Sequence, residues 1–164
     1  MMNLLFSPTG RIAPSQYMRG MIILGVVAAV LALLPLLSMT LGTIAGLLGF
    51  VLFYCVIALG IKRSHDAGKS GWWSIAHILL FLLVSTALTW ILLTVFGLSM
   101  GDMFRSAAGG DVSAVEEFTQ ASIIPSAIAT LLTYPITAFL VNMLNPHDPT
   151  PNQYGNIVDG ATFD

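Results

Sequence analysis

The chain has 164 residues, of which 56% are hydrophobic and 9% are Asp, Glu, Lys or Arg. A soluble domain carries about a quarter charged residues, so this composition excludes a water-soluble globule and indicates one helical membrane domain. The net charge of -2 and the single cysteine, Cys55, argue against a nucleic-acid-binding surface, an intramolecular disulfide and a cysteine metal cluster.

The first apolar stretch begins at Gly20 and continues for 42 residues without a charged side chain. It is too long for the hydrophobic region of a signal peptide. A single helix of this length would reach about 60 Å, roughly twice the hydrocarbon thickness. Because Pro35 and Gly42 lie near its middle, the sequence predicts a tight hairpin of two helices, over 18–37 and 41–61.

A polar segment, 62–71, separates this hairpin from an apolar run that predicts a third helix over 72–96. Residues 97–120 hold four acidic side chains and are interpreted as an external loop. Within that loop, Ser113 and Glu116 match a capping box that would start a short helix.

A fourth helix is predicted over 121–144, and the residues that follow it, 145–164, are rich in Pro, Asn and Gly. This composition favours turns, so the tail is predicted to be irregular. The predicted fold is therefore an all-α membrane protein, a bundle of about four transmembrane helices.

The positions of Lys and Arg predict the orientation. With four spans, the N-terminal segment 1–17, the polar segment 62–71 and the tail lie on one side of the membrane, together with every basic residue except Arg105. Positive residues in short loops stay cytoplasmic. We therefore expect both termini and the tail to be cytoplasmic.

The densest polar sequence runs from Lys62 to Trp73 and has three interpretations. It can be an interfacial anchor, in which Asp66 to Gly68 turn the chain and Ser70 caps the next helix. It can also bind anionic lipid headgroups through its Lys and Arg side chains. A nucleotide-binding P-loop is rejected, because Arg63 stands where that motif requires glycine.

His65-Asp66 is echoed by His147-Asp148, so a two-histidine, two-carboxylate metal site is geometrically conceivable. No helical ligand spacing supports it, and we expect neither a metal nor a cofactor. His77 is the one ionisable side chain well inside a predicted span, where a neutral, hydrogen-bonded histidine is favoured over a functional one.

Two kinds of small-residue face occur in the predicted spans. Hydroxyl side chains line one face of the third helix and one of the fourth, either to hydrogen bond between helices or to line a solute path. They are Ser85, Thr89, Ser126, Thr130, Thr133 and Thr137. Gly42, Gly46 and Gly49 predict close contact of the second helix with the first helix or with a second copy.

Three elements resemble the bacterial inner-membrane proteins grouped as domain-of-unknown-function family 805 (DUF805). The elements are the string Arg63, His65-Asp66, Gly68 and Ser70 to Trp73, the opening Phe6, Gly10-Arg11 and Tyr17, and the closing Pro151 to Gly155. The chain departs from the family pattern at Pro14 and Met18. The resemblance implies a multi-helix bacterial inner-membrane protein, and it transfers no catalytic residue.

All three elements fall on the same predicted side of the membrane, so we interpret them as one juxtamembrane polar cluster. Asp66 is expected to pair with Arg11 or Arg63, and Tyr154 to pack over Trp72. The candidate residues for this cluster are Arg11, Lys62, Arg63, His65, Asp66, Lys69, Trp72, Trp73, Asn152 and Tyr154.

The function favoured by these patterns is a non-enzymatic membrane component that binds lipid headgroups or a protein partner through this cluster. The expected partners are membrane lipids, particularly anionic ones, and a membrane protein or a second copy of the chain. The alternative is a small-solute channel or transporter that uses the hydroxyl faces. No enzyme is expected, because no nucleophile has an adjacent base.

Overall fold

The computed structural model describes residues 2–156, so the last part of the predicted tail, 157–164, lies outside the described residues. The described chain is helical, with no strand. Its elements are α1 (Met2–Phe6), α2 (Pro14–Leu33), the short 3₁₀ turn η1 (Leu34–Leu36), α3 (Met39–Asp66), the 3₁₀ turn η2 (Gly71–Trp73), α4 (Ser74–Val95), α5 (Met100–Ala108) and α6 (Val112–Leu144).

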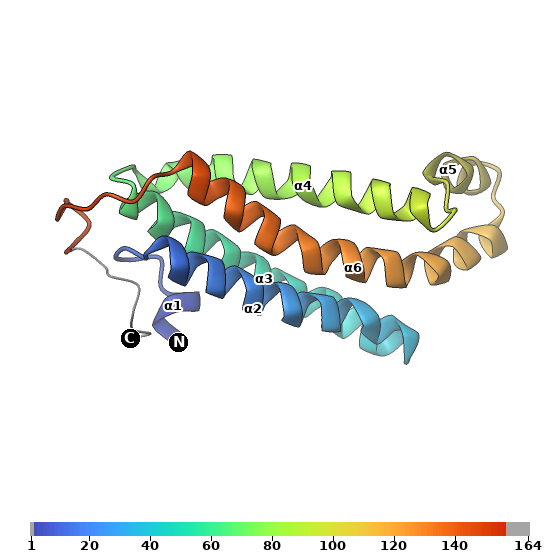
Figure 1. Ribbon diagram of the computed structural model, residues 1–164. Helices are drawn as coiled ribbons and strands as arrows, with labels where there is room; N and C mark the ends of the chain where they lie inside the picture. The colour runs from blue at the N-terminus through green and yellow to red at the C-terminus, as the bar shows by residue number, and fades with distance from the viewer. Residues whose placement is uncertain (1, 157–164) are drawn as a thin grey trace.

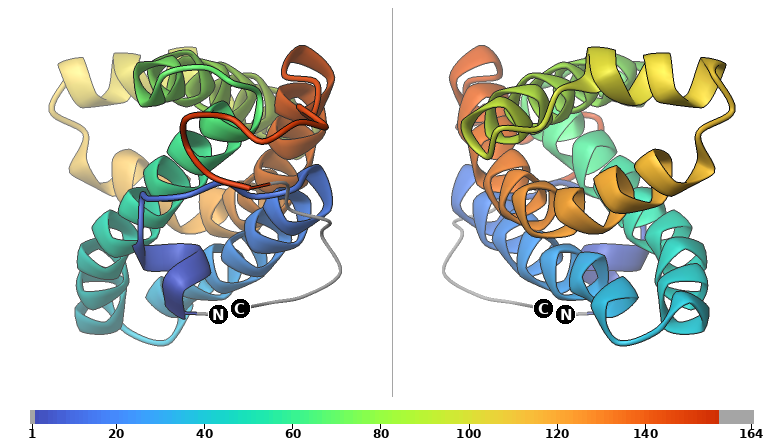
Figure 2. Two further views of the ribbon diagram at one scale, coloured as in Figure 1. Left: turned by 90° about the vertical axis from the view of Figure 1, so that its left-hand side faces the viewer. Right: turned by 90° about the vertical axis from the view of Figure 1, so that its right-hand side faces the viewer.

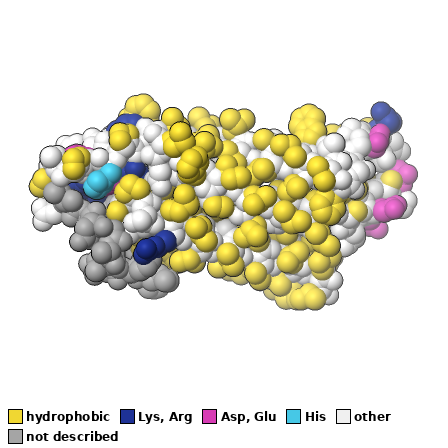
Figure 3. Space-filling model, in the orientation of Figure 1, with side chains coloured by type: hydrophobic (Ala, Val, Ile, Leu, Met, Phe, Trp, Pro, Cys, Tyr) yellow, Lys and Arg dark blue, Asp and Glu magenta, His cyan; other side chains and the backbone are white. Residues whose placement is uncertain are grey.

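Four helical segments in the described chain are long and apolar enough to cross a membrane: α2 with η1, α3, η2 with α4, and α6. This confirms the prediction of an all-α bundle with four spans. The long helices lie side by side, with α6 packed against α2 and α4, and α3 packed against α2 (Figure 1). Hydrophobic side chains cover the middle of the surface, whereas charged side chains gather at its two ends (Figure 3).

The two ends of the bundle differ in how tightly they are packed. We call one end the Asp66 end; it contains the end of α3, the loop that follows α3 and the described tail. The buried apolar core lies toward this end, around Tyr17, Leu59 and Val141. The opposite end, the α5 end, carries the α2–α3 hairpin and α5 (Figure 1). The Asp66 end also holds buried charged side chains, among them Arg11, Arg63 and Asp66.

Two helices of the first hairpin extend beyond their predicted limits. The first begins at Pro14 instead of residue 18, and the second continues to Asp66 instead of ending at residue 61. Lys and Arg are good helix formers, so the helix continues after its apolar stretch has ended. It stops before Gly68, whose φ of 69° suits glycine.

The predicted external loop 97–120 is largely helical. It contains α5, and α6 starts at Val112, where Asp111 Oδ1 accepts a hydrogen bond from the Ala114 N–H at 3.1 Å. Asp111 therefore takes the capping role that the sequence assigned to Ser113 and Glu116. A hydropathy pattern identifies the apolar part of a membrane helix, but it does not identify the polar residues by which the helix extends beyond that part.

Among the described residues, the predicted glycine face of α3 makes a close contact at Gly42 alone. A Cβ at Gly42 would lie 3.0 Å from the Pro35 side chain, so this glycine permits the tight hairpin. Gly46 and Gly49 have nothing within 4 Å of such a Cβ. The close helix contact is elsewhere: a Cβ at Gly25 of α2 would lie 2.9 Å from Cβ of Tyr134 on α6.

Candidate functional site: a buried ion cluster and an adjoining groove

The Asp66 carboxylate lies at the end of α3 and is fully buried. It accepts hydrogen bonds from Arg63 Nη1 at 2.7 Å and from Arg11 Nη2 at 3.2 Å, and His147 Nδ1 lies 2.8 Å from it. Asp66 was predicted to pair with Arg11 or Arg63, and in the structure it pairs with both arginines. We call Asp66, Arg11, Arg63 and His147 the ion cluster.

Arg11 joins the N-terminal segment to the tail. Its guanidinium donates to the backbone carbonyls of Asp148 at 2.6 Å and Thr150 at 2.8 Å, and it also reaches the Gly155 carbonyl at 3.3 Å. The tail crosses the end of α3, where Asp148 N–H donates to the Asp66 carbonyl (Figure 2). One side chain therefore satisfies backbone carbonyls of a segment that has no helix of its own.

Arg63 makes the equivalent links to α6 and α2. Its Nε donates to Asn142 Oδ1 at 2.8 Å, and its Nη2 donates to the Asn145 carbonyl. Asn142 in turn donates to the Pro14 carbonyl at 3.0 Å, at the first residue of α2. Neither amide was predicted to belong to this network, although Asn142 lies at the end of the last predicted span and Asn145 directly after it.

His65, Asn152 and Tyr154 form the outer side of the same network. The His65 and Tyr154 rings stack with centroids 3.9 Å apart, and Asn152 Nδ2 donates to the His65 carbonyl at 3.1 Å. Tyr154 therefore packs on His65 and not on Trp72 as expected. The tail reaches the last turn of α3, where Asn152 donates to the His65 carbonyl, whereas Trp72 is 79% exposed.

The charges of this network balance within the described residues. Two arginines face the Asp66 carboxylate and the nearby Asp148, and hydrogen bonds from Thr150 and Asn152 lower the pKa of Asp148 to about 2. In a buried ion pair, removal of one partner leaves the other charge buried without compensation, so the segments that carry the pair are held together. The ion cluster is built to cross-link the chain, and its arginines are already occupied.

The two lysines of the predicted cluster have different surroundings. Lys62 is buried, and its Nζ donates to the Leu4 carbonyl, which holds α1 against α3. Lys69 is only partly buried; its Nζ donates to Asn145 Oδ1 at 2.7 Å and lies 4.8 Å from the centroid of the Trp73 ring. Lys69 is thus the predicted cation with room for a further ligand.

A groove of about 480 Å³ starts at Lys69 and runs between α4 and the end of α6; we call it the Lys69 groove. Asn145 and the buried His77 form its inner wall and are joined by a 2.8 Å hydrogen bond between Asn145 Nδ2 and His77 Nε2. The other lining residues are apolar, and they are Trp73, Ala76, Leu79, Leu80, Leu83 and Leu144.

The hydroxyl faces lie in two separate settings. Thr133 and Thr137 are buried between helices, and the Thr133 hydroxyl donates to the Ala129 carbonyl of its own helix at 2.8 Å. Ser85 and Thr89 instead line a hollow of about 260 Å³ that also includes Met100, the first residue of α5. This arrangement fits helix packing for the face on α6.

No group of three or more His, Cys, Asp and Glu side chains in the described chain is arranged to hold a metal ion. His147 is hydrogen bonded to Asp66, and His65 is stacked on Tyr154. The repeated His-Asp pairs therefore take part in the network that joins the loop to the tail.

Four membrane-length helices, joined at one end by a buried ion cluster, define a multi-pass helical membrane protein. The family model described as "Protein of unknown function (DUF805)" matches residues 5–156, so the chain belongs to this family. No curated protein and no solved structure matches the chain. The matched range includes every residue of the ion cluster and of the Lys69 groove.

Proposed function

We propose that this protein is a non-enzymatic component of the bacterial inner membrane that holds an anionic phospholipid of the cytoplasmic leaflet in the Lys69 groove. Both termini and the Asp66 end face the cytoplasm in this proposal. The observation that carries it is the combination of an apolar groove open at the lipid-facing surface with a lysine ammonium at its mouth.

The groove has the chemistry of an amphiphile site. Leu79, Leu80 and Leu83 offer an apolar wall for an acyl chain, and Leu79 and Leu83 are exposed at the surface of α4. An ammonium has three donors, of which Asn145 takes one among the described residues, so Lys69 can donate to a lipid phosphate. Trp73 beside it suits the membrane interface, where indole rings are enriched.

The position of Lys69 also favours it over the arginines. Arg11 and Arg63 are committed to Asp66 and to backbone carbonyls, and reaching a headgroup would break a buried ion pair. A basic residue near an anionic leaflet contributes about 1 kcal/mol to lipid attraction. This is roughly a fivefold preference for an anionic over a neutral phospholipid, provided by Lys69.

The proposal is tested by lipid retention. The full chain is reconstituted in nanodiscs of equal phosphatidylglycerol and phosphatidylcholine, extracted gently, and the retained lipids are counted by native mass spectrometry. Wild type should retain phosphatidylglycerol preferentially, and Lys69→Gln should reduce that preference about fivefold. Leu83→Trp, which narrows the groove, should reduce retention of both lipids.

Arg105→Gln is the matched control, because it removes an exposed cation at the α5 end, outside the groove. It should leave the retained lipid unchanged, and circular dichroism should show equal helicity for all variants. Equal loss in the Lys69 and Arg105 variants, or no preference in wild type, would refute the site. A protein that co-purifies in place of lipid would also overturn the proposal.

A further inference from the structure

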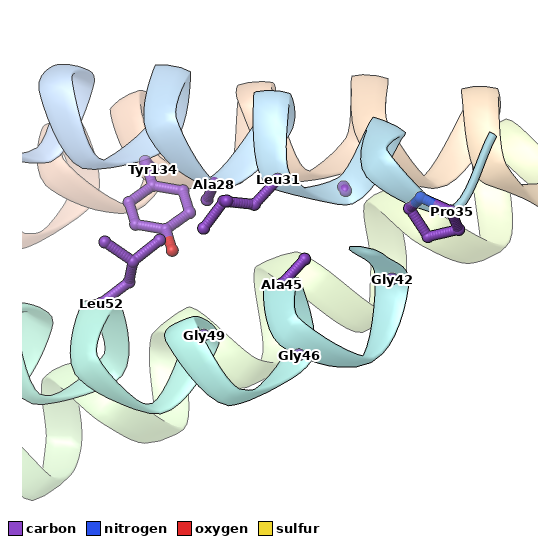
Figure 4. Close-up of a pocket in the computed structure, with 10 residues that line it drawn as sticks. Ala28, Leu31, Pro35, Gly42, Ala45, Gly46, Gly49, Leu52 and Tyr134 are labelled. Carbon is purple, nitrogen blue, oxygen red and sulfur yellow. The ribbon is translucent and has the colours of Figure 1, made fainter. Parts of the chain in front are cut away.

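A second hollow, of about 300 Å³, lies between α2 and α3 in a different part of the bundle (Figure 4). Small side chains make most of its walls, and Tyr134 of α6 closes one end; we call it the Tyr134 hollow. Its smallest wall residues are Ala28, Ala32, Gly42, Ala45, Gly46 and Gly49. Gly46 and Gly49 line this hollow, and a Cβ at either position would meet no atom of the described chain within 4 Å.

Tyr134 supplies a polar group to this apolar space. Its side chain is held by an edge-on contact with Phe81, with centroids 5.1 Å apart, and the residue is only 6% exposed. Its hydroxyl forms no hydrogen bond with any residue in the described part of the chain, and Figure 4 shows the oxygen directed into the space between α2 and α3. A hydroxyl in hydrocarbon strongly favours having a partner.

The depth of Tyr134 limits what that partner can be. The residue lies ten positions before the end of α6, which places it about 15 Å from that end and near the middle of the hydrocarbon. Phospholipid headgroups and ester groups do not reach this depth. A saturated acyl chain could fill the hollow, but it would leave the hydroxyl without a partner.

Size and charge narrow the choice further. One turn of a transmembrane helix, about 10 Å across and 5.4 Å long, fills roughly 400 Å³, so a helix cannot enter a hollow of about 300 Å³. No charged residue lines the hollow, so its ligand is neutral. The ligand that fits is slender and apolar and carries a carbonyl oxygen that can accept the Tyr134 hydroxyl.

We infer that the Tyr134 hollow binds a prenylated quinone, with a quinone carbonyl accepting a hydrogen bond from Tyr134 and the ring lying against the glycine wall of α3. This site is separate from the Lys69 groove and does not depend on the proposed lipid function. Only binding is inferred, without electron transfer.

Titration of decylubiquinone into the full chain in detergent micelles, followed by calorimetry, tests the inference. The chain should bind one quinone, and decylbenzene, which has the same chain without carbonyls, should bind at least several-fold more weakly. Tyr134→Phe should weaken quinone binding about two- to tenfold, the value of one hydrogen bond, and leave decylbenzene unaffected.

Gly46→Leu places a side chain in the hollow where nothing lies within 4 Å, so it should abolish quinone binding without unfolding the chain. Its matched control is Gly101→Leu, in α5 and outside the hollow. Tyr54→Phe is the control for the hydroxyl, because Tyr54 donates to the Phe6 carbonyl and lines no part of the hollow. Unchanged quinone affinity in Gly46→Leu, or equal affinity for quinone and decylbenzene, would overturn the inference.

Discussion

Asp66 is the residue on which the polar end of the bundle depends most. It is fully buried between Arg11 and Arg63, and its loss would leave two buried guanidiniums without a carboxylate. Breaking a buried ion pair by removing one partner typically destabilises a protein by about 3–5 kcal/mol. Asp66→Asn should therefore lower the melting temperature clearly in detergent, as measured by circular dichroism.

Asp111→Asn is the comparison, since Asp111 is exposed and caps α6, a role that asparagine fills equally well. It should leave the melting temperature almost unchanged. If the two asparagine variants melted at the same temperature, the ion cluster would not be holding the Asp66 end together.

Asp148 predicts a pH dependence. Its pKa is lowered to about 2 by hydrogen bonds from Thr150 and Asn152, whereas an unfolded aspartate titrates near 3.9. A lowered pKa stabilises the folded state above the unfolded pKa, and this contribution is lost as the pH falls through the folded pKa. Wild type should thus melt above Asp148→Asn at pH 5, with the gap closing between pH 4 and pH 2. A gap independent of pH would contradict this.

Much of the polar network could be predicted at the residue scale. Arg11, Asp66 and Asn152 carry the family-like pattern and lie on one side of a four-span topology, which is enough to bring them together. Asn142 and Asn145 could not be found, because an amide side chain at a helix end has no distinctive spacing. The stacking of Tyr154 on His65 depends on the path of an irregular tail, which hydropathy does not specify.

Among the elements, the crossing of α2 and α6 depends on Gly25. A Cβ at this position would lie 2.9 Å from Tyr134 Cβ, which is closer than side chains approach, so Gly25→Ala should force the helices apart. Overpacking of this kind costs about 1–3 kcal/mol. Gly46→Ala, with nothing within 4 Å, should be neutral or stabilising, because alanine favours helix over glycine.

Thermal melts of both alanine variants in the same detergent measure this difference. Equal melting temperatures of Gly25→Ala and Gly46→Ala would mean that α2 and α6 can accommodate an added methyl group at Gly25 without a loss of stability. The sequence predicted that Gly42, Gly46 and Gly49 share one face of a helix, and it predicted close helix contact along that face. Helical spacing shows which residues share a face, but it does not show which element packs against that face. Gly25 is followed by alanines at helical spacing, Ala29 and Ala32, so a search for small residues in general, and not for glycines alone, would have marked this face.

The sequence predicted the four apolar spans, but it did not predict where the helices begin and end. Apolar runs located all four spans, since only lipid-facing segments need so many apolar residues in succession. The polar end of α3 and the polar start of α6 were not predicted, because these residues are helical through their intrinsic helix propensity and their caps and not through an apolar pattern. Asp111 would have been found by weighing every Asp before a helix-forming run as a cap.

The orientation of the whole molecule is a separate prediction. Five of the six basic residues precede residue 70, near the Asp66 end, and Arg105 alone lies in α5. Fusion of green fluorescent protein to the C-terminus should give fluorescent cells, whereas alkaline phosphatase inserted between Gly109 and Gly110 should be active. Positive-inside placement requires this result, and activity of phosphatase at the C-terminus would reverse the proposed orientation.

The order in which the ion cluster is synthesised sets when that end of the protein can close. Arg11, Arg63 and Asp66 are made early, but the carbonyls of Asn145, Asp148, Thr150 and Gly155 that complete their hydrogen bonds come in the last twenty residues. While the later helices enter the membrane, Arg11 and Arg63 thus have Asp66 as a partner but lack these carbonyls, and basic residues in this state favour the cytoplasmic side. A chain cut short before residue 145 should therefore keep its four membrane-length helices and the pairs that Asp66 makes with Arg11 and Arg63, but it lacks the carbonyls through which Arg11 and Arg63 hold the last segment.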